Sequence, residues 1–104
     1  MLSPEEELVL VRHVHLLSER IRTDKELTSD RLHFIKDVFP DLYSILAKLQ
    51  PDETIKIFEK YRDHPFFKTD MEIALSPKGK EWVAKEVELF RAHSKSAAEQ
   101  HPTN

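Results

Sequence analysis

The chain has 104 residues, a formal net charge of −3 and no cysteine. This length is typical of a single domain whose apolar core needs neither a disulfide nor a structural metal. The longest aliphatic run, Leu8–Val11, is far shorter than a membrane span, which takes roughly 20 apolar residues. Acids and bases are interspersed, whereas nucleic-acid-binding proteins usually carry a basic stripe. We therefore expect a cytoplasmic protein with no membrane segment, for which nucleic acid is a less favoured partner.

Glycine is almost absent from the chain: Gly79 is the only one, and most of the six prolines stand at joints between apolar segments. Tight hairpins and phosphate-binding loops depend on glycine because it adopts positive φ freely. Helices capped by Ser, Thr or Asp and opened by proline do not need it. The composition predicts an all-α fold, a compact bundle of about five helices.

The first predicted helix runs from Pro4 to about Arg22. It begins with Ser3-Pro4 and three glutamates: the serine oxygen caps the helix, proline fits its first turn, and the acids face the positive end of the helix dipole. Its main apolar stripe recurs every three or four residues. Val9 and Leu16 lie beside that stripe and widen the apolar surface.

Four further helices are predicted at residues 28–38, 41–50, 51–64 and 77–93. Polar caps precede the first of these, and proline opens or closes the others. Leu32, Ile35 and Phe39 form the apolar stripe of the first one. The residues expected in the core of the whole domain are Leu10, Val14, Leu17, Leu42, Ile45, Leu46, Leu49, Phe58, Trp82, Val83 and Phe90.

Two segments depart from this pattern. Residues 66–75 contain a short alternation of apolar and polar side chains, and a very short strand pair, a short helix and a loop all remain open there. Residues 94–104 are polar and small, lack periodicity and contain a proline. We predict a single helical domain at residues 1–93 followed by a disordered tail at residues 94–104.

The sequence lacks the usual signs of an enzyme or a metal site. It has no activated cysteine, no Gly-x-Ser-x-Gly elbow and no glycine-rich phosphate loop. None of the six histidines lies four residues from another, the spacing of a helical chelate. His15 with Glu19 and His33 with Asp37 have that separation, but such pairs are more often surface interactions. We predict a non-catalytic protein without cofactor or resident metal, and leave open whether these pairs bind one.

Glu86 falls inside the apolar arc of the last helix. A carboxylate buried without a partner is costly, so either its stem reaches out to solvent or this part of the arc faces a partner protein. Phe66 and Phe67 are adjacent and cannot easily point the same way. We therefore expect one of them to be buried and the other at least partly exposed.

Residues 74–83, Ala-Leu-Ser-Pro-Lys-Gly-Lys-Glu-Trp-Val, resemble the strand-to-helix exit that follows the wing of winged-helix transcription regulators. Upstream, residues 46–49, the break at Pro51-Asp52 and residues 54–61 resemble a helix-turn-helix. The resemblance implies a DNA-binding regulator of reduced winged-helix type, with its wing between Tyr61 and Leu75. This is the alternative hypothesis.

The leading hypothesis is a small protein-binding regulator or adaptor. The first and last helices carry more apolar surface than one small core needs, and association buries such surface around a few anchors with a charged rim. The partner is another protein or a second copy, most simply in a two-fold dimer. The predicted partner-binding residues are Val9, Leu16, Phe66, Phe67, Glu86 and Leu89.

Overall fold

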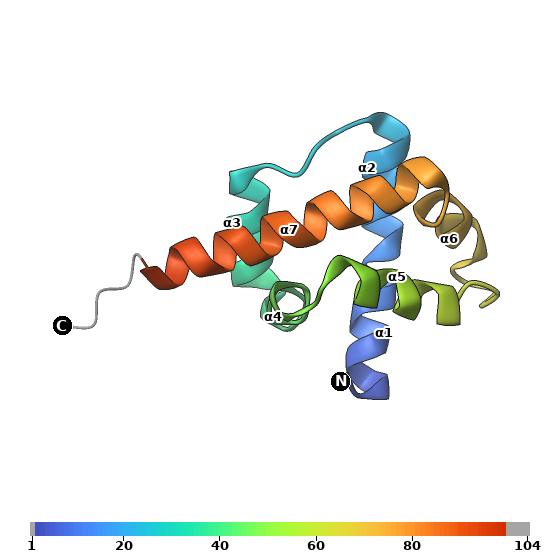
Figure 1. The fold of residues 1–104 in the computed structure, drawn as a ribbon, viewed down its shortest axis with the longest axis horizontal. Coiled ribbons are helices and arrows are strands. Elements are labelled where there is room, and N and C mark those ends of the chain that lie inside the picture. Colours follow the sequence, from blue (N-terminus) through green and yellow to red (C-terminus); the bar gives the residue numbers. More distant parts are fainter. Residues whose placement is uncertain (1, 100–104) are drawn as a thin grey trace.

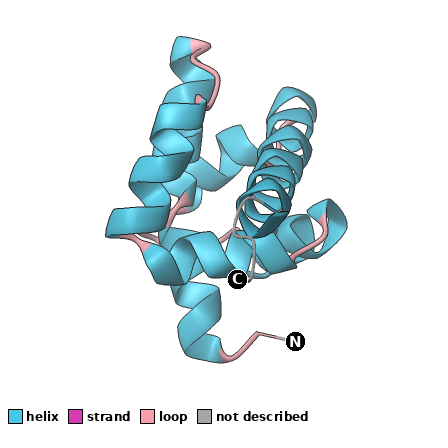
Figure 2. Ribbon diagram, turned by 90° about the vertical axis from the view of Figure 1, so that its left-hand side faces the viewer, coloured by secondary structure: helices cyan, strands magenta, loops and turns pink. Residues whose placement is uncertain are grey.

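Figure 1 shows the computed structural model, which describes residues 2–99. Well over half of the chain is helical, and these residues form no strand (Figure 2), which confirms the predicted all-α bundle. The helices are α1 (Pro4–Arg12), α2 (Val14–Thr23), α3 (Ser29–Val38), α4 (Pro40–Lys48), α5 (Pro51–Lys60), α6 (Lys68–Ala74) and α7 (Pro77–Glu99). Within residues 2–99 no helix is both long and apolar enough to cross a bilayer.

The predicted first helix is present but is divided at His13 into α1 and α2, which follow each other as one rod interrupted by a single turn. The amide of His13 donates to the Leu10 carbonyl at 3.0 Å, a tighter turn than the α-helical one, and the α-helical pattern resumes with Leu17 donating to His13 at 3.0 Å. Such a turn inside a helix often accompanies a local constraint. The side chain of His13 is buried here against α7.

The long helix α7 passes across the other helices and closes the core (Figure 1). Val83, Val87 and Phe90 project from it into a cluster with residues of α1, α2, α4 and α5. Every residue predicted for the core is buried except Trp82, which is half-buried against the cluster. Because these residues recur with helical spacing in each segment, the sequence alone was enough to identify them.

Gly79 lies in the first turn of α7, where this helix touches the end of α6. Its φ is not positive. A Cβ placed on it would lie far inside van der Waals contact with the backbone oxygens of Ile73 and Ala74. A glycine is therefore needed at this position because the backbones of α6 and α7 approach each other closely.

Both uncertain segments of the sequence contain helix. Residues 68–74 form α6, whose Met71 and Ala74, three residues apart, are buried. The disordered tail predicted from residue 94 is wrong for residues 94–99, which continue α7. Lys, Ala and Glu favour a helix, and no glycine or proline interrupts it before Pro102. Residues 100–104 of the predicted tail lie outside the described residues.

Candidate functional site

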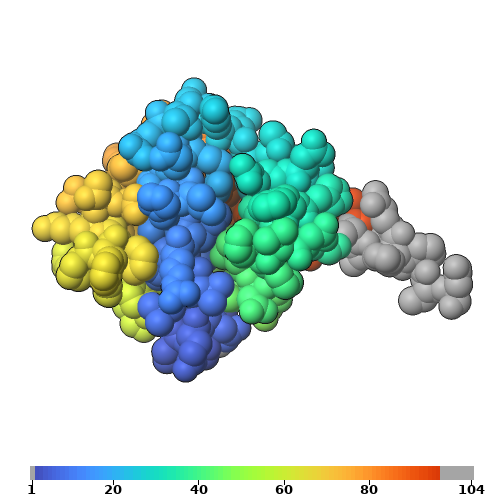
Figure 3. All heavy atoms as spheres, turned by 180° about the vertical axis from the view of Figure 1, so that it is seen from behind, coloured from blue at the N-terminus to red at the C-terminus, as the bar shows by residue number. Residues whose placement is uncertain are grey.

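Most of the exposed large apolar side chains lie in two grooves on either side of the α1–α2 rod. Among residues 2–99 the exposed ones are Leu8, Leu16, Phe34, Val38, Phe39 and Phe66. All except Val38 line one of two grooves that flank the α1–α2 rod. Figure 3 shows this rod along the middle of one face, with α3 and α4 on one side and the segment containing α6 on the other.

The first groove, here called the α6 groove, lies between the rod and the segment around α6 and has a volume of about 510 Å³. Phe66 is 85% exposed, and the ring of His64 stacks on it with centroids 5.7 Å apart. Phe67 packs partly against the core. The lining residues are Leu8, Arg12, His15, His64, Phe66, Phe67 and Asp70.

The second groove, here called the α3 groove, lies between α2 and α3 and has a volume of about 560 Å³. Leu16, 48% exposed, lines it from α2. Phe34 and Phe39 line it from α3 and the joint with α4, their rings edge to face with centroids 6.3 Å apart. The guanidinium of Arg31 lies 5.5 Å from the centre of the Phe34 ring. The groove thus combines apolar walls with a polar rim.

The rims of the two grooves offer positive charge. Glu19 pairs with Arg22, and Glu26 pairs with Lys85. Arg12, Lys25 and Arg31, by contrast, have no carboxylate within ion-pair distance in the part of the chain that the structure describes. Acids on a binding partner would therefore find cations available along this face.

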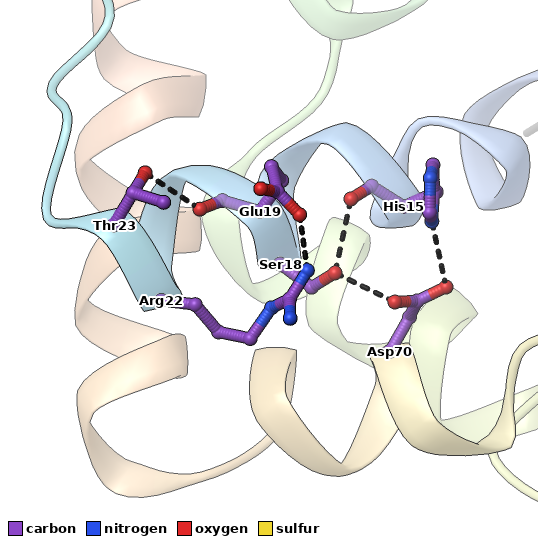
Figure 4. Close-up of polar contacts among 6 residues, drawn as sticks. All are labelled: His15, Ser18, Glu19, Arg22, Thr23 and Asp70. Atoms are coloured by element: carbon purple, nitrogen blue, oxygen red, sulfur yellow. Dashed lines mark hydrogen bonds and ion pairs between the residues drawn. The ribbon is translucent and has the colours of Figure 1, made fainter.

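Ser18, Asp70 and His15 meet beside the α6 groove, as Figure 4 shows. The Ser18 hydroxyl lies 2.6 Å from Asp70 Oδ1, and His15 Nδ1 lies 3.3 Å from Asp70 Oδ2. In a catalytic triad the histidine stands between the hydroxyl and the acid. Here the acid stands between them, and Ser18 is fully buried. The cluster is not arranged for nucleophilic attack; it ties α6 to α2.

The predicted partner-binding residues divide into three groups. Leu16 and Phe66 are exposed in the grooves, and Phe67 lines the α6 groove while half-buried. Val9 and Leu89 are half-buried against the core. Glu86 is only 4% exposed, so the hypothesis that it contacts a partner is wrong. Its carboxylate is satisfied inside the protein.

Glu86 forms a bidentate ion pair with Arg20. Nε of Arg20 lies 2.7 Å from Oε2 and Nη2 lies 2.6 Å from Oε1, while His13 Nε2 lies 3.7 Å from Oε1. Burial alone would raise the pKa of Glu86, but the polar contacts with His13 and Arg20 outweigh it, so the pKa of this carboxyl falls below its usual range. The group joins α2 to α7 across the core.

The sequence did not predict that Leu8, Phe34 and Phe39 are exposed on the surface. Phe39 has the expected helical spacing for the buried stripe of α3, but the proline that follows it disfavours α-helical geometry there. With φ −126° and ψ 61°, the chain turns and leaves the ring about half exposed. The restriction that Pro40 imposes was visible in the sequence, although its effect on the ring direction was not.

The histidines have different partners from those that spacing suggested. His15 contacts Asp70, not Glu19, and His33 contacts His93, not Asp37. No group of three or more His, Asp or Glu side chains within residues 2–99 is placed to hold a metal ion.

The described residues contain no wing of the kind that the winged-helix hypothesis requires. The segment between Tyr61 and Leu75 consists of turns and α6, and residues 2–99 include no strand from which a wing could be built. The helix expected to follow a wing, α7, instead packs across the core.

Compared with known proteins, the chain matches no family model, no curated protein and no solved structure.

Proposed function

We propose that this protein is a non-catalytic regulator or adaptor that binds a helical segment of a partner protein on the face formed by the α6 groove and the α3 groove. One observation supports this most directly: five exposed large apolar side chains lie along the two sides of a single rod. Single exposed apolar residues are ordinary on protein surfaces, whereas a group of them with a polar rim is typical of an interaction site.

The shape and charge of the face favour a helix with acidic flanks as the bound segment. Amphipathic helices dock into apolar grooves through side chains spaced three, four and seven residues apart. Leu16 and Phe34 face such a segment from the two walls of the α3 groove. Arg12, Lys25 and Arg31 at the rims, which pair with no carboxylate in the described part of the chain, match acids beside its apolar stripe.

The test uses helical peptides, apolar on one face and acidic on its flanks, selected from a displayed library against the full chain. We expect Leu16→Gln and Phe66→Ser to weaken binding of the selected peptides by at least about tenfold each, as for central anchors of an interface. Fluorescence polarisation gives the affinities. The free energy of unfolding should change by less than about 1 kcal/mol, because both side chains are exposed.

Val38 provides the matched control for these substitutions. It is 50% exposed but lines neither groove, so Val38→Ser removes a similar apolar group outside the proposed face. Peptide affinity should not change. If Val38→Ser weakens binding as much as Leu16→Gln, or if the library yields no binder, the face is not the docking site. Sedimentation equilibrium of the same variants tests for a second copy as the partner.

A further inference from the structure

His33 on α3 and His93 on α7 face each other although they are 60 residues apart in the sequence. Their Nε2 atoms lie 3.5 Å apart and their ring centroids 4.5 Å apart. Both atoms are carried by helices that pack against each other. The pair therefore belongs to the tertiary structure and not to one helix surface.

The separation of these nitrogens is close to that of two ligands on one metal ion. Zinc binds histidine nitrogens at about 2.0–2.1 Å in tetrahedral geometry, which places two such nitrogens roughly 3.3 Å apart. Two imidazoles that converge from neighbouring helices thus need only a small adjustment to bind one ion. Divalent ions of the zinc, copper and nickel type are the ones that imidazole suits.

Tyr43 orients the ring of His93 for this role. Its hydroxyl lies 2.7 Å from Nδ1 of His93, and the tyrosine is itself buried, its ring packed edge to face on Phe90. In the tautomer with the proton on Nδ1, His93 donates to the tyrosine oxygen and its Nε2 lone pair faces His33. Metal-binding histidines usually have such a partner on the second ring nitrogen, because it holds the tautomer and the ring direction.

We propose that His33 and His93 form a binding site for one divalent transition-metal ion of the zinc type, which would link α3 to α7, with water filling the remaining positions. The site is independent of the two grooves and of the proposed docking function.

Lys36 carries a positive charge that acts on His93 and opposes a bound cation. It lies on α3, with its ammonium 5.9 Å from the centre of the Tyr43 ring. Lys36→Gln removes this charge without touching either proposed ligand. The variant should bind the metal more tightly than the unmodified chain, an effect that a merely structural histidine pair would not produce.

Calorimetric titration of the full chain with zinc chloride at pH 7.5 tests the site, with magnesium chloride as the negative control. We expect one zinc ion per chain and no binding of magnesium. His33→Gln and His93→Gln should each weaken zinc binding by more than about tenfold, and Tyr43→Phe by about tenfold, the effect typical of losing a partner of a ligating histidine. Zinc should raise the unfolding temperature of the unmodified chain but not that of either histidine variant.

His15→Gln and His64→Gln are the matched controls, since both remove a histidine from the α6 groove. Zinc affinity should be unchanged in both. Nitrogen-15 spectra of the imidazoles provide a second readout, in which zinc should shift Nε2 of His33 and His93. The proposal is overturned if the chain binds no zinc, if the His33 and His93 variants bind it as well as the unmodified chain, or if the His15 or His64 variant abolishes binding.

Discussion

Gly79→Ala should destabilise the protein by about 3 kcal/mol or more, although alanine stabilises an ordinary helix by about 1 kcal/mol relative to glycine. The added methyl would overlap the backbone oxygens of Ile73 and Ala74 at the end of α6. Backbone atoms cannot move aside as a flexible side chain can, so α6 and α7 would have to separate. Excess volume in a packed site usually costs about 1–3 kcal/mol and sometimes more.

Urea denaturation measures this effect, with Lys80→Ala as the control. Lys80 is the next residue of the same helical turn and is exposed, so its replacement should change the free energy of unfolding by less than about 0.5 kcal/mol. A Gly79→Ala variant as stable as the unmodified chain, or more stable, would show that α6 and α7 do not approach as closely as described here.

Glu86→Ala should cost about 3–5 kcal/mol, because removing one partner of a buried ion pair leaves the other charge without compensation. The guanidinium of Arg20, whose side chain is only 14% exposed, would lose both of its hydrogen bonds to the carboxylate. The double variant Arg20→Met with Glu86→Leu should be more stable than Glu86→Ala alone, since apolar groups of similar volume often replace a buried pair without loss. Urea denaturation of the two variants and the unmodified chain gives the comparison. Equal stability of Glu86→Ala and the unmodified chain would contradict the buried pair.

The same ion pair predicts a dependence of stability on pH. The pKa of Glu86 is lower in the folded protein than its ordinary value near 4.5, so the folded state holds this proton less tightly than the unfolded state does. The stability that the carboxylate contributes is therefore present above about pH 4.5 and is lost as the pH falls through the folded pKa. Between pH 5 and pH 3 the unmodified chain should lose more stability than Glu86→Gln. Parallel curves for the two proteins would contradict this assignment.

Regular features of the fold could be predicted from the sequence because they depend on neighbours along the chain. The start of α1 depends on Ser3 and Glu6, whose side chains cap each other's backbone amides. The interruption at His13 between α1 and α2 could not be predicted in this way. Its ring is buried against Glu86, and nothing in the local pattern of the first helix reveals that contact.

The candidate site was predicted only in part for the same reason. Leu16 could be identified because it lies beside the main apolar stripe of its helix, and Phe66 because it lies in a loop. Both are exposed. Phe34 was missed because the groove that it lines also needs a wall from α2, and the sequence does not show that α2 lies opposite α3. The partner of Glu86 was missed because Arg20 is 66 residues away, where helical spacing carries no information.

The position of α7 also determines the order in which the molecule can be completed during synthesis. This helix contacts α2, α3, α4, α5 and α6, yet it is the last of the described helices to leave the ribosome, where chains grow at about 5–20 residues per second. Until residues 77–90 emerge, the surfaces of the earlier helices that pack against α7 have no cover. The residues that line the two grooves all precede residue 77. The proposed binding face is therefore translated before the helix that packs across the other helices.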